Sequence, residues 1–184
     1  MEFIDARRLT GPSLLFDLPG SILDVACTDD EAARLEPAWE KHLGRMLKAV
    51  GWHDCALASI RLTGGISLGF TAPVDALYAA SEINEWAWAA CEAELNGTPE
   101  PDFDEAVARL TAAIEEEANP ELMRLLAAAA EHGVTLLWDD DFVSLGHGRF
   151  SETWPVRELP DPAALDWGAF RDVPSGLVTG TNGK

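Results

Sequence analysis

Between residues 14 and 70, short apolar runs separated by turn residues predict two β-hairpins. Pro19-Gly20 suits the central positions of a type II turn, so segments 14–18 and 21–27 are expected to pair. Segments 55–62 and 66–70 flank Gly64-Gly65, which favours a primed turn. In the second hairpin we expect Ala58, Ile60 and Leu62 on one face and Arg61 on the other, because side chains alternate along a strand.

Apolar residues that recur every three or four positions predict four to five helices. Each expected helix begins at a recognisable capping signal, and the starts fall at Thr28 with Glu31, at Pro73, at Asp102 with Glu105, and at Asn119-Pro120. Glycines mark three of the expected ends, at Gly51, Gly97 and Gly133. Further along, segments 134–138 and 142–145 read as strands joined by a turn of three aspartates. Together these elements predict an α+β fold.

The end of the chain has a different composition. After Trp154-Pro155, a proline-rich stretch over 156–174 reads as a linker, and 175–184 reads as one appended strand and loop. We therefore expect a folded domain over 1–155, followed by the linker and the appended segment. His147 stands between Gly146 and Gly148, where it can approach a ligand or simply mark a bend.

Composition excludes some classes of function. The 184 residues are 47% hydrophobic and include seven Trp, which is enough for a proper core. The formal net charge of −19 argues against a nucleic-acid partner, since phosphate contacts require a basic face. No apolar run approaches the length of a membrane span, and Met1 leads directly into acidic residues rather than a basic leader. We expect a cytoplasmic protein with no membrane partner.

Residues with reactive side chains are plentiful but not arranged in known local motifs. Cys27, Cys55 and Cys91 are widely spaced and read as small buried residues in a reducing compartment. The four histidines show no spacing typical of a zinc site, so no metal site is predicted. No serine stands in a nucleophile elbow, and we assign no catalytic residue.

The most specific signal lies at residues 176–184. A short apolar run leads into Thr179-Gly180-Thr181-Asn182-Gly183-Lys184, which has the layout of a strand feeding a phosphate-binding loop. Backbone N–H groups of such a loop point at phosphates, and Lys184 would supply a cation to the β- and γ-phosphates. The strict Walker A pattern is broken, because Val178 stands where a glycine is required. A glycine-rich polar tail is the alternative reading.

These six residues resemble the Thr-Gly-Thr-Asn-Gly-Lys loop of the Mur ligase family. Mur ligases are ATP-dependent enzymes that join an amine to a carboxylate through an acyl phosphate. The resemblance implies ATP and Mg²⁺ as cofactors of the full-length ligase and assigns Thr179, Gly180, Thr181, Asn182, Gly183 and Lys184 to ATP binding. The Mg²⁺ ligands and the helix that should follow the loop are expected beyond residue 184.

A second resemblance covers roughly residues 1 to 155. The order of four short motifs is similar to that of the amino-terminal domain of cyanophycin synthetases, and the motifs are Leu9-Thr10-Gly11-Pro12, Gly64-Gly65, an acidic helix after Pro73, and Val143-Ser144-Leu145-Gly146-His147-Gly148. In those enzymes such a domain holds a growing polymer of aspartate and arginine. The sequence departs from that family in having no ATP-grasp module before residue 175, and in carrying Tyr78, Glu82, Glu85, Trp86 and Trp88 where the synthetases have histidines.

Together the resemblances imply the amino-terminal fragment of an ATP-dependent carboxylate–amine ligase, with the fragment itself non-catalytic. The implied partner is a peptide or amino-acid substrate, with arginine-containing peptides as one candidate, and Glu82, Glu85 and His147 are the candidate contacts. A homo-oligomer is a further expected assembly. The alternative, from a different class of function, is a self-contained acidic binding or oligomerisation module without ligase activity.

Overall fold

The computed structural model describes residues 1–174 and 176. These residues form two compact units, the first over Met1–Ala118 and the second from Asn119 onward. Both combine helices with antiparallel strands, so the predicted α+β class is confirmed. The boundary between the units lies between Ala118 and Asn119 and differs from the expected boundaries of 1–155, 156–174 and 175–184. The expected division was made by function, and it stays a prediction.

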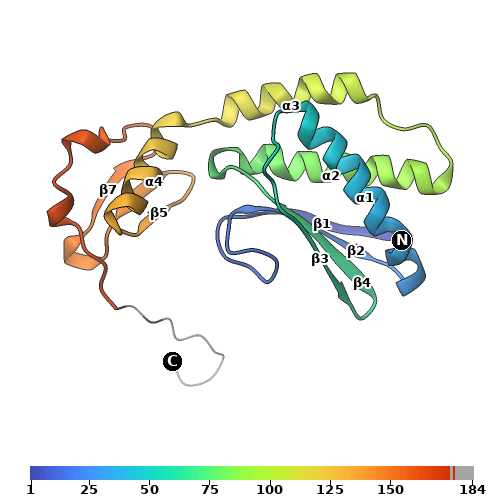
Figure 1. The fold of residues 1–184 in the computed structure, drawn as a ribbon, viewed down its shortest axis with the longest axis horizontal. Helices are drawn as coiled ribbons and strands as arrows, with labels where there is room; N and C mark the ends of the chain where they lie inside the picture. The colour runs from blue at the N-terminus through green and yellow to red at the C-terminus, as the bar shows by residue number, and fades with distance from the viewer. Residues whose placement is uncertain (175, 177–184) are drawn as a thin grey trace. The chain divides into compact units, whose positions relative to one another are not determined.

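A four-stranded antiparallel sheet forms the base of the first unit (Figure 1). Its strand order is β1-β2-β4-β3, with β1 at Glu2–Leu9, β2 at Gly20–Ala26, β3 at Leu57–Leu62 and β4 at Gly65–Thr71. Helices α1 (Asp29–Ala49) and α2 (Leu77–Asn96) cover one face, and α3 (Phe103–Glu117) packs on α2. Alternate residues of β2 and β4 point into the core with the helices, because successive strand side chains face opposite ways.

The second hairpin is confirmed, with a one-residue change at its turn. Leu62 pairs with Gly65, so Thr63 and Gly64 form the turn. Gly64 has a positive φ of 83° and Thr63 does not, so the turn is not of the expected primed type, which needs a positive φ at its first central residue. Ser59 and Arg61 both bond to Glu36 of α1 and therefore face the helices. The expected alternation is present, but its apolar side lies on the outer face of the sheet.

The first predicted hairpin is wrong. Strand β2 pairs with β1 rather than with segment 14–18, which lies in the long connection between these two strands. Leu15 and Phe16 of this connection lie against Gly69, where an added Cβ would be 2.7 Å and 3.2 Å from their side-chain atoms. The side chains of Leu15 and Phe16 thus cover part of the outer face of the sheet. Periodicity alone does not distinguish an apolar segment that covers a sheet from one that forms a strand.

The helix ends follow their local capping chemistry. Thr28 and Glu31 form the predicted capping box, and Gly97 and Gly133 end α2 and α4 (Pro120–His132) with positive φ values of 67° and 65°. Helix α2 has no side-chain cap of its own after the short 3₁₀ turn Val74–Ala76. Its first N–H groups, on Tyr78 and Ala79, donate instead to the Glu117 carboxylate at the end of α3, at 2.9 Å each.

The second unit holds α4 and a three-stranded sheet of order β5-β6-β7. The strands are Leu136–Trp138, Phe142–Leu145 and Glu152–Pro155, the last of which was not predicted. Three short 3₁₀ turns, at Gly148–Phe150, Pro162–Ala164 and Trp167–Ala169, complete it. Residues of the expected linker pack on this unit's core, and they include Val156, Leu159, Leu165, Trp167 and the buried Phe170. Within the described residues, no helix is both long enough and apolar enough to cross a membrane.

Candidate functional site

The predicted phosphate-binding residues, Thr179 to Lys184, lie outside the described residues. The chain that leads toward them is firmly attached to the second unit. Asp172 accepts hydrogen bonds from the backbone N–H of Thr135 at 3.1 Å and from its hydroxyl at 2.6 Å. The carbonyl of Arg171 accepts from the backbone N–H of His147 at 3.0 Å.

His147 is a partly exposed side chain in the second unit. From the sequence, it either approaches a ligand or marks a bend in the backbone, and the structure shows where the bend arises. Its own φ of −130° is ordinary, while Gly146 and Gly148 on either side have positive φ values of 71° and 60°. The flanking glycines therefore supply the bend. Nδ1 lies 3.2 Å from Asp172 Oδ1. This is a close contact rather than an oriented hydrogen bond, since the described residues give Nδ1 no hydrogen-bond partner.

The local charges favour an ionised carboxylate beside His147. Hydrogen bonds from Thr135 lower the pKa of Asp172, and His147 adds a smaller electrostatic contribution in the same direction. The result is an imidazole held next to a carboxylate, a layout that can bind a hydrogen-bonding group.

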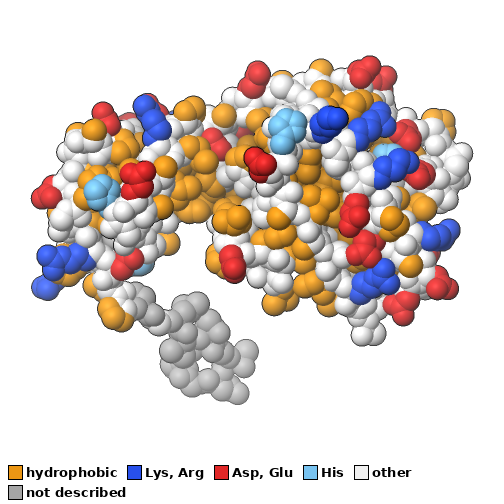
Figure 2. Space-filling model, viewed as in Figure 1, with side chains coloured by type: hydrophobic (Ala, Val, Ile, Leu, Met, Phe, Trp, Pro, Cys, Tyr) orange, Lys and Arg blue, Asp and Glu red, His pale blue; other side chains and the backbone are white. Residues whose placement is uncertain are grey.

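The two predicted contact residues on α2 have different surroundings. Glu82 forms an ion pair with Arg109 of α3, whereas Glu85 is exposed. A continuous acidic face was one expectation for this helix, yet Glu94 near its end also contacts basic groups of α1. Figure 2 shows acidic and basic side chains interspersed on the face it draws. The acidic side of α2 is therefore partly used in contacts within the unit.

The three cysteines have neutral thiols as their favoured form. Burial raises the pKa of Cys91 to about 12, with the nearby charge of Glu94 acting in the same direction. Burial also raises the pKa of Cys27 and Cys55, which are only partly buried. All three are free thiols, and the expectation of three small buried residues holds for Cys91 but not for Cys27 and Cys55.

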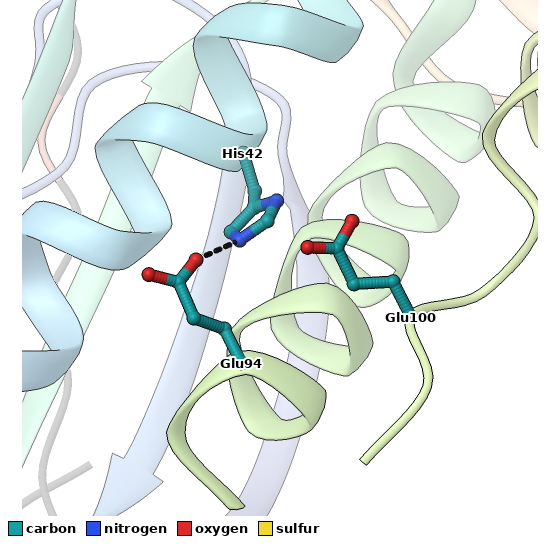
Figure 3. A group of neighbouring side chains, drawn as sticks. All are labelled: His42, Glu94 and Glu100. Carbon is teal, nitrogen blue, oxygen red and sulfur yellow. Dashed lines mark hydrogen bonds and ion pairs between the residues drawn. The ribbon is translucent and has the colours of Figure 1, made fainter. Parts of the chain in front are cut away.

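A cluster that sequence spacing did not suggest joins His42, Glu94 and Glu100 (Figure 3). His42 lies on the buried side of α1 and is 1% exposed. Glu94 comes from the last turn of α2, and Glu100 from the segment between α2 and α3. His42 Nε2 lies 2.6 Å from Glu94 Oε2, and one ligand atom from each residue falls within 4.8 Å of the others.

The cluster is balanced by two basic side chains of α1. Lys41 Nζ lies 2.7 Å from Glu94 Oε2, and Arg45 lies 3.4 Å from Glu100 Oε2. The hydrogen bond from Lys41, followed by that from His42, lowers the pKa of Glu94. The edge of the Trp86 ring packs on the imidazole with centroids 6.4 Å apart. This arrangement can hold a cation or position a proton between the imidazole and a carboxylate.

Only part of this cluster could have been found from the sequence. His42 follows Trp39 by three positions and precedes Met46 by four, so the helical pattern places it on the buried stripe. Glu94 lies 52 residues further along the chain, and no local motif connects the two. The packing of α1 against α2 brings them together.

A hollow of about 420 Å³ on the outer face of the first unit's sheet is a second candidate for ligand binding. Its polar part contains Asp24, which accepts hydrogen bonds from Ser67 Oγ and from Arg7 at 2.5 Å each. Its apolar part is supplied by exposed strand and connection residues, including Ile4, Leu14 and Leu62. A polar centre with an apolar rim suits a small amphipathic ligand.

Comparison of the chain with models of known protein families gives no match, and comparison with curated proteins gives none either.

Proposed function

We propose that the chain is the amino-terminal part of an ATP-dependent carboxylate–amine ligase of the Mur type. Residues 1–174 hold the substrate or support the ligase, and the chemistry belongs to the module that begins at the phosphate-binding loop. The observation that carries this proposal is the six-residue segment Thr179 to Lys184, whose likeness to the Mur ligase loop is specific.

In the intact ligase the loop would hold the phosphates of MgATP through backbone N–H groups and the Lys184 ammonium. The γ-phosphoryl group passes to a substrate carboxylate and forms an acyl phosphate, with ADP as the leaving group. An amine then attacks the acyl carbon, an amide bond forms, and phosphate leaves. ATP and Mg²⁺ are thus the cofactors of the full-length enzyme.

The attachment of residues 170–172 supports a link between the second unit and the loop. Phe170 is buried in that unit's core and Asp172 is held by Thr135, so the chain is anchored seven residues before Thr179. The backbone N–H of His147 donates to the carbonyl of Arg171, so His147 contacts this anchored segment. A ligand bound near His147 would therefore contact the part of the chain that leads into the loop.

The substrate side of the proposal is a peptide or amino acid, with arginine-containing peptides as the first candidates. Glu82 already pairs with a guanidinium, that of Arg109, which is the type of group an arginine side chain would present. Glu85 offers an exposed carboxylate one turn along the same helix. These contacts are exposed to solvent, so peptide binding through them is expected to weaken with added salt.

The test is an assay of the gene's full-length product with MgATP, a mixture of amino acids and short peptides as carboxylate and amine donors, and detection of ADP and of the new amide. We expect Lys184→Ala to lower turnover by about a hundredfold or more, because a charge that contacts the transferring phosphate is lost. Lys48→Ala, at the exposed end of α1, is the matched control and should leave turnover unchanged. Failure of the full-length product to bind MgATP, or equal activity of Lys184→Ala, would overturn the proposal.

A self-contained binding or oligomerisation module remains the second candidate, because large apolar side chains are exposed on the outer side of the first unit's sheet. Leu14 is 93% exposed and Leu18 is 62% exposed. Sedimentation velocity over a range of concentrations tests this reading. A concentration-dependent dimer that Leu14→Ser abolishes, in a full-length product without ATP binding, would favour it over the ligase.

A further inference from the structure

The imidazole of His42 combines deep burial with an unused hydrogen-bonding nitrogen. Its side chain is 1% exposed, and Nε2 bonds to Glu94, yet Nδ1 has no hydrogen-bond partner among the described residues. Buried polar atoms in proteins are nearly always paired, so a buried nitrogen without a partner requires an explanation. Nε2, held against a carboxylate, is the nitrogen that a metal ion would take, and the unpaired Nδ1 shows that the packing around this ring leaves it incompletely satisfied.

Two carboxylates complete the surroundings of that ring. In Figure 3 the side chains of Glu94 and Glu100 extend toward the imidazole from opposite sides. The three residues come from three segments, α1, the end of α2 and the connection to α3, and their ligand atoms lie within 4.8 Å of one another. We propose that His42, Glu94 and Glu100 form a binding site for one divalent transition-metal ion of the Zn²⁺ type. This inference does not depend on the proposed ligase function.

The ligand atoms are near enough to one another that small movements would bring them to the spacing of a tetrahedral zinc site. Ligand atoms at about 2.0–2.2 Å from Zn²⁺ are separated from one another by roughly 3.3 Å. The 2.6 Å between His42 Nε2 and Glu94 Oε2 is that of a hydrogen bond, so metal binding would replace the shared proton and widen this distance slightly. Glu100 stands on a short connection between two helices, which can move by the small distance needed to close the site.

The ligand chemistry favours Zn²⁺ over Mg²⁺ or Ca²⁺. Imidazole nitrogen binds Zn²⁺ and its neighbours in the first transition row, while Mg²⁺ and Ca²⁺ prefer all-oxygen sites. Three protein ligands leave a fourth position for water. The net charge of −19 also raises the local concentration of cations around the chain.

Lys41 and Arg45 compete with such an ion. The Lys41 ammonium is bonded to the same Glu94 oxygen as His42, and Arg45 is paired with Glu100. Both basic side chains are substantially exposed, so Lys41 can turn into solvent when the metal binds, while the Arg45 guanidinium also lies over the Phe103 ring, 3.6 Å from its centroid. The Lys41 ammonium therefore competes with a metal ion for Glu94, and its removal should strengthen metal binding.

The experiment is isothermal titration of the metal-stripped 184-residue chain with ZnCl₂ at pH 7. We expect one equivalent of Zn²⁺ to bind the unaltered chain. Glu100→Gln should weaken this binding by on the order of tenfold to a hundredfold, because the loss of a coordinating charge has at least the effect of losing a supporting contact. Glu100 is exposed, so this variant should keep its fold, which circular dichroism checks.

Two further variants separate a coordination site from general attraction. Glu92→Gln removes an exposed carboxylate of α2 outside the cluster and should leave the affinity unchanged. Lys41→Met should raise the affinity several-fold because the competing ammonium is gone. Stoichiometric binding that Glu100→Gln weakens and Glu92→Gln does not would support the site. The proposal is overturned if no stoichiometric Zn²⁺ binds, if both Gln variants behave alike, or if Mg²⁺ binds as tightly as Zn²⁺.

Discussion

Both units of this chain pack helices on an antiparallel sheet, but they differ in the number and length of these elements. The first unit stacks long helices on one face of a four-stranded sheet, and large side chains such as Trp39, Leu43 and Phe70 are fully buried there. The second unit has one helix and a sheet of three short strands, and its core is completed by Trp167 and Phe170 from beyond the last strand. A small sheet cannot bury enough surface alone, so the second unit depends on a segment that looks like a linker.

The two units also differ in where their connecting side-chain hydrogen bonds lie, which is in the core of the first unit and at the surface of the second. In the first unit, Asn84 is 0% exposed, accepts a hydrogen bond from Trp39 Nε1 at 2.8 Å and donates toward Ser21 Oγ at 3.3 Å. One side chain thus connects α1, α2 and the sheet within the core. In the second unit the comparable connection, Asp172 to Thr135, lies at the surface and ties down the end of the described chain. Three substitutions can break or sharpen this comparison.

The largest effect is expected from Phe170→Ala. We expect a loss of about 3–5 kcal/mol in the stability of the second unit, because a buried phenyl ring is removed from its small core. Phe142→Ala is the matched control in the same unit, since Phe142 is 51% exposed and should cost far less. Hydrogen exchange of the β5–β7 amides measures both effects. Equal, small changes for the two variants would mean that 156–170 behaves as a linker after all.

A smaller effect is expected from Asn84→Ala in the first unit. It leaves the indole N–H of Trp39 buried without its acceptor, which costs about 1–3 kcal/mol. Asn96→Ala, at the exposed end of the same helix, serves as the control. Urea unfolding followed by tryptophan fluorescence gives the free energies of unfolding. If the two variants proved equally stable, Asn84 would not be the connection that the comparison assigns to it.

The smallest effect on stability concerns Asp172. Its pKa is lowered in the folded chain, so its contribution to stability is present above the unfolded value near 3.8 and is lost as the pH falls through the folded value. Thr135→Val removes the hydroxyl donor and should raise the pKa of Asp172 toward 3.8, as read from carboxyl carbon shifts by NMR. Ser144→Ala, which removes a hydroxyl bonded to Thr153 instead, should not change this pKa. A titration that Thr135→Val leaves unaltered would contradict the assigned cause.

Local chemistry made some of the fold predictable. The capping residues Thr28, Asp102 and Asn119 each begin a helix at the expected place, and Gly97 and Gly133 end two of them. The interactions involved join atoms within a few residues of one another, so the sequence contains both partners side by side. The hairpin of β3 and β4 was predictable for the same reason, since its turn lies between its strands.

The features that local patterns did not predict share the opposite property. Segment 14–18 has the apolar character of a strand, but the choice of β1 as the partner of β2 depends on which strand reaches the sheet edge. The proline-rich composition of 156–174 indicates a linker, yet Trp167 and Phe170 supply apolar surface that only the finished second unit can bury. The candidate metal cluster follows the same rule, because His42 and Glu94 meet only through helix packing.

By itself, the sequence determined the class of fold, most of the helix boundaries and the strongly acidic composition, and it is the basis of the proposed likeness of residues 179–184 to a nucleotide loop. The tertiary structure alone decided which strands pair, that the segment after Pro155 completes a core, and that an imidazole and two carboxylates converge beside α1. The physical reason is distance along the chain. Caps and turns act between near neighbours, whereas strand pairing, burial and side-chain clusters depend on which distant surfaces pack together.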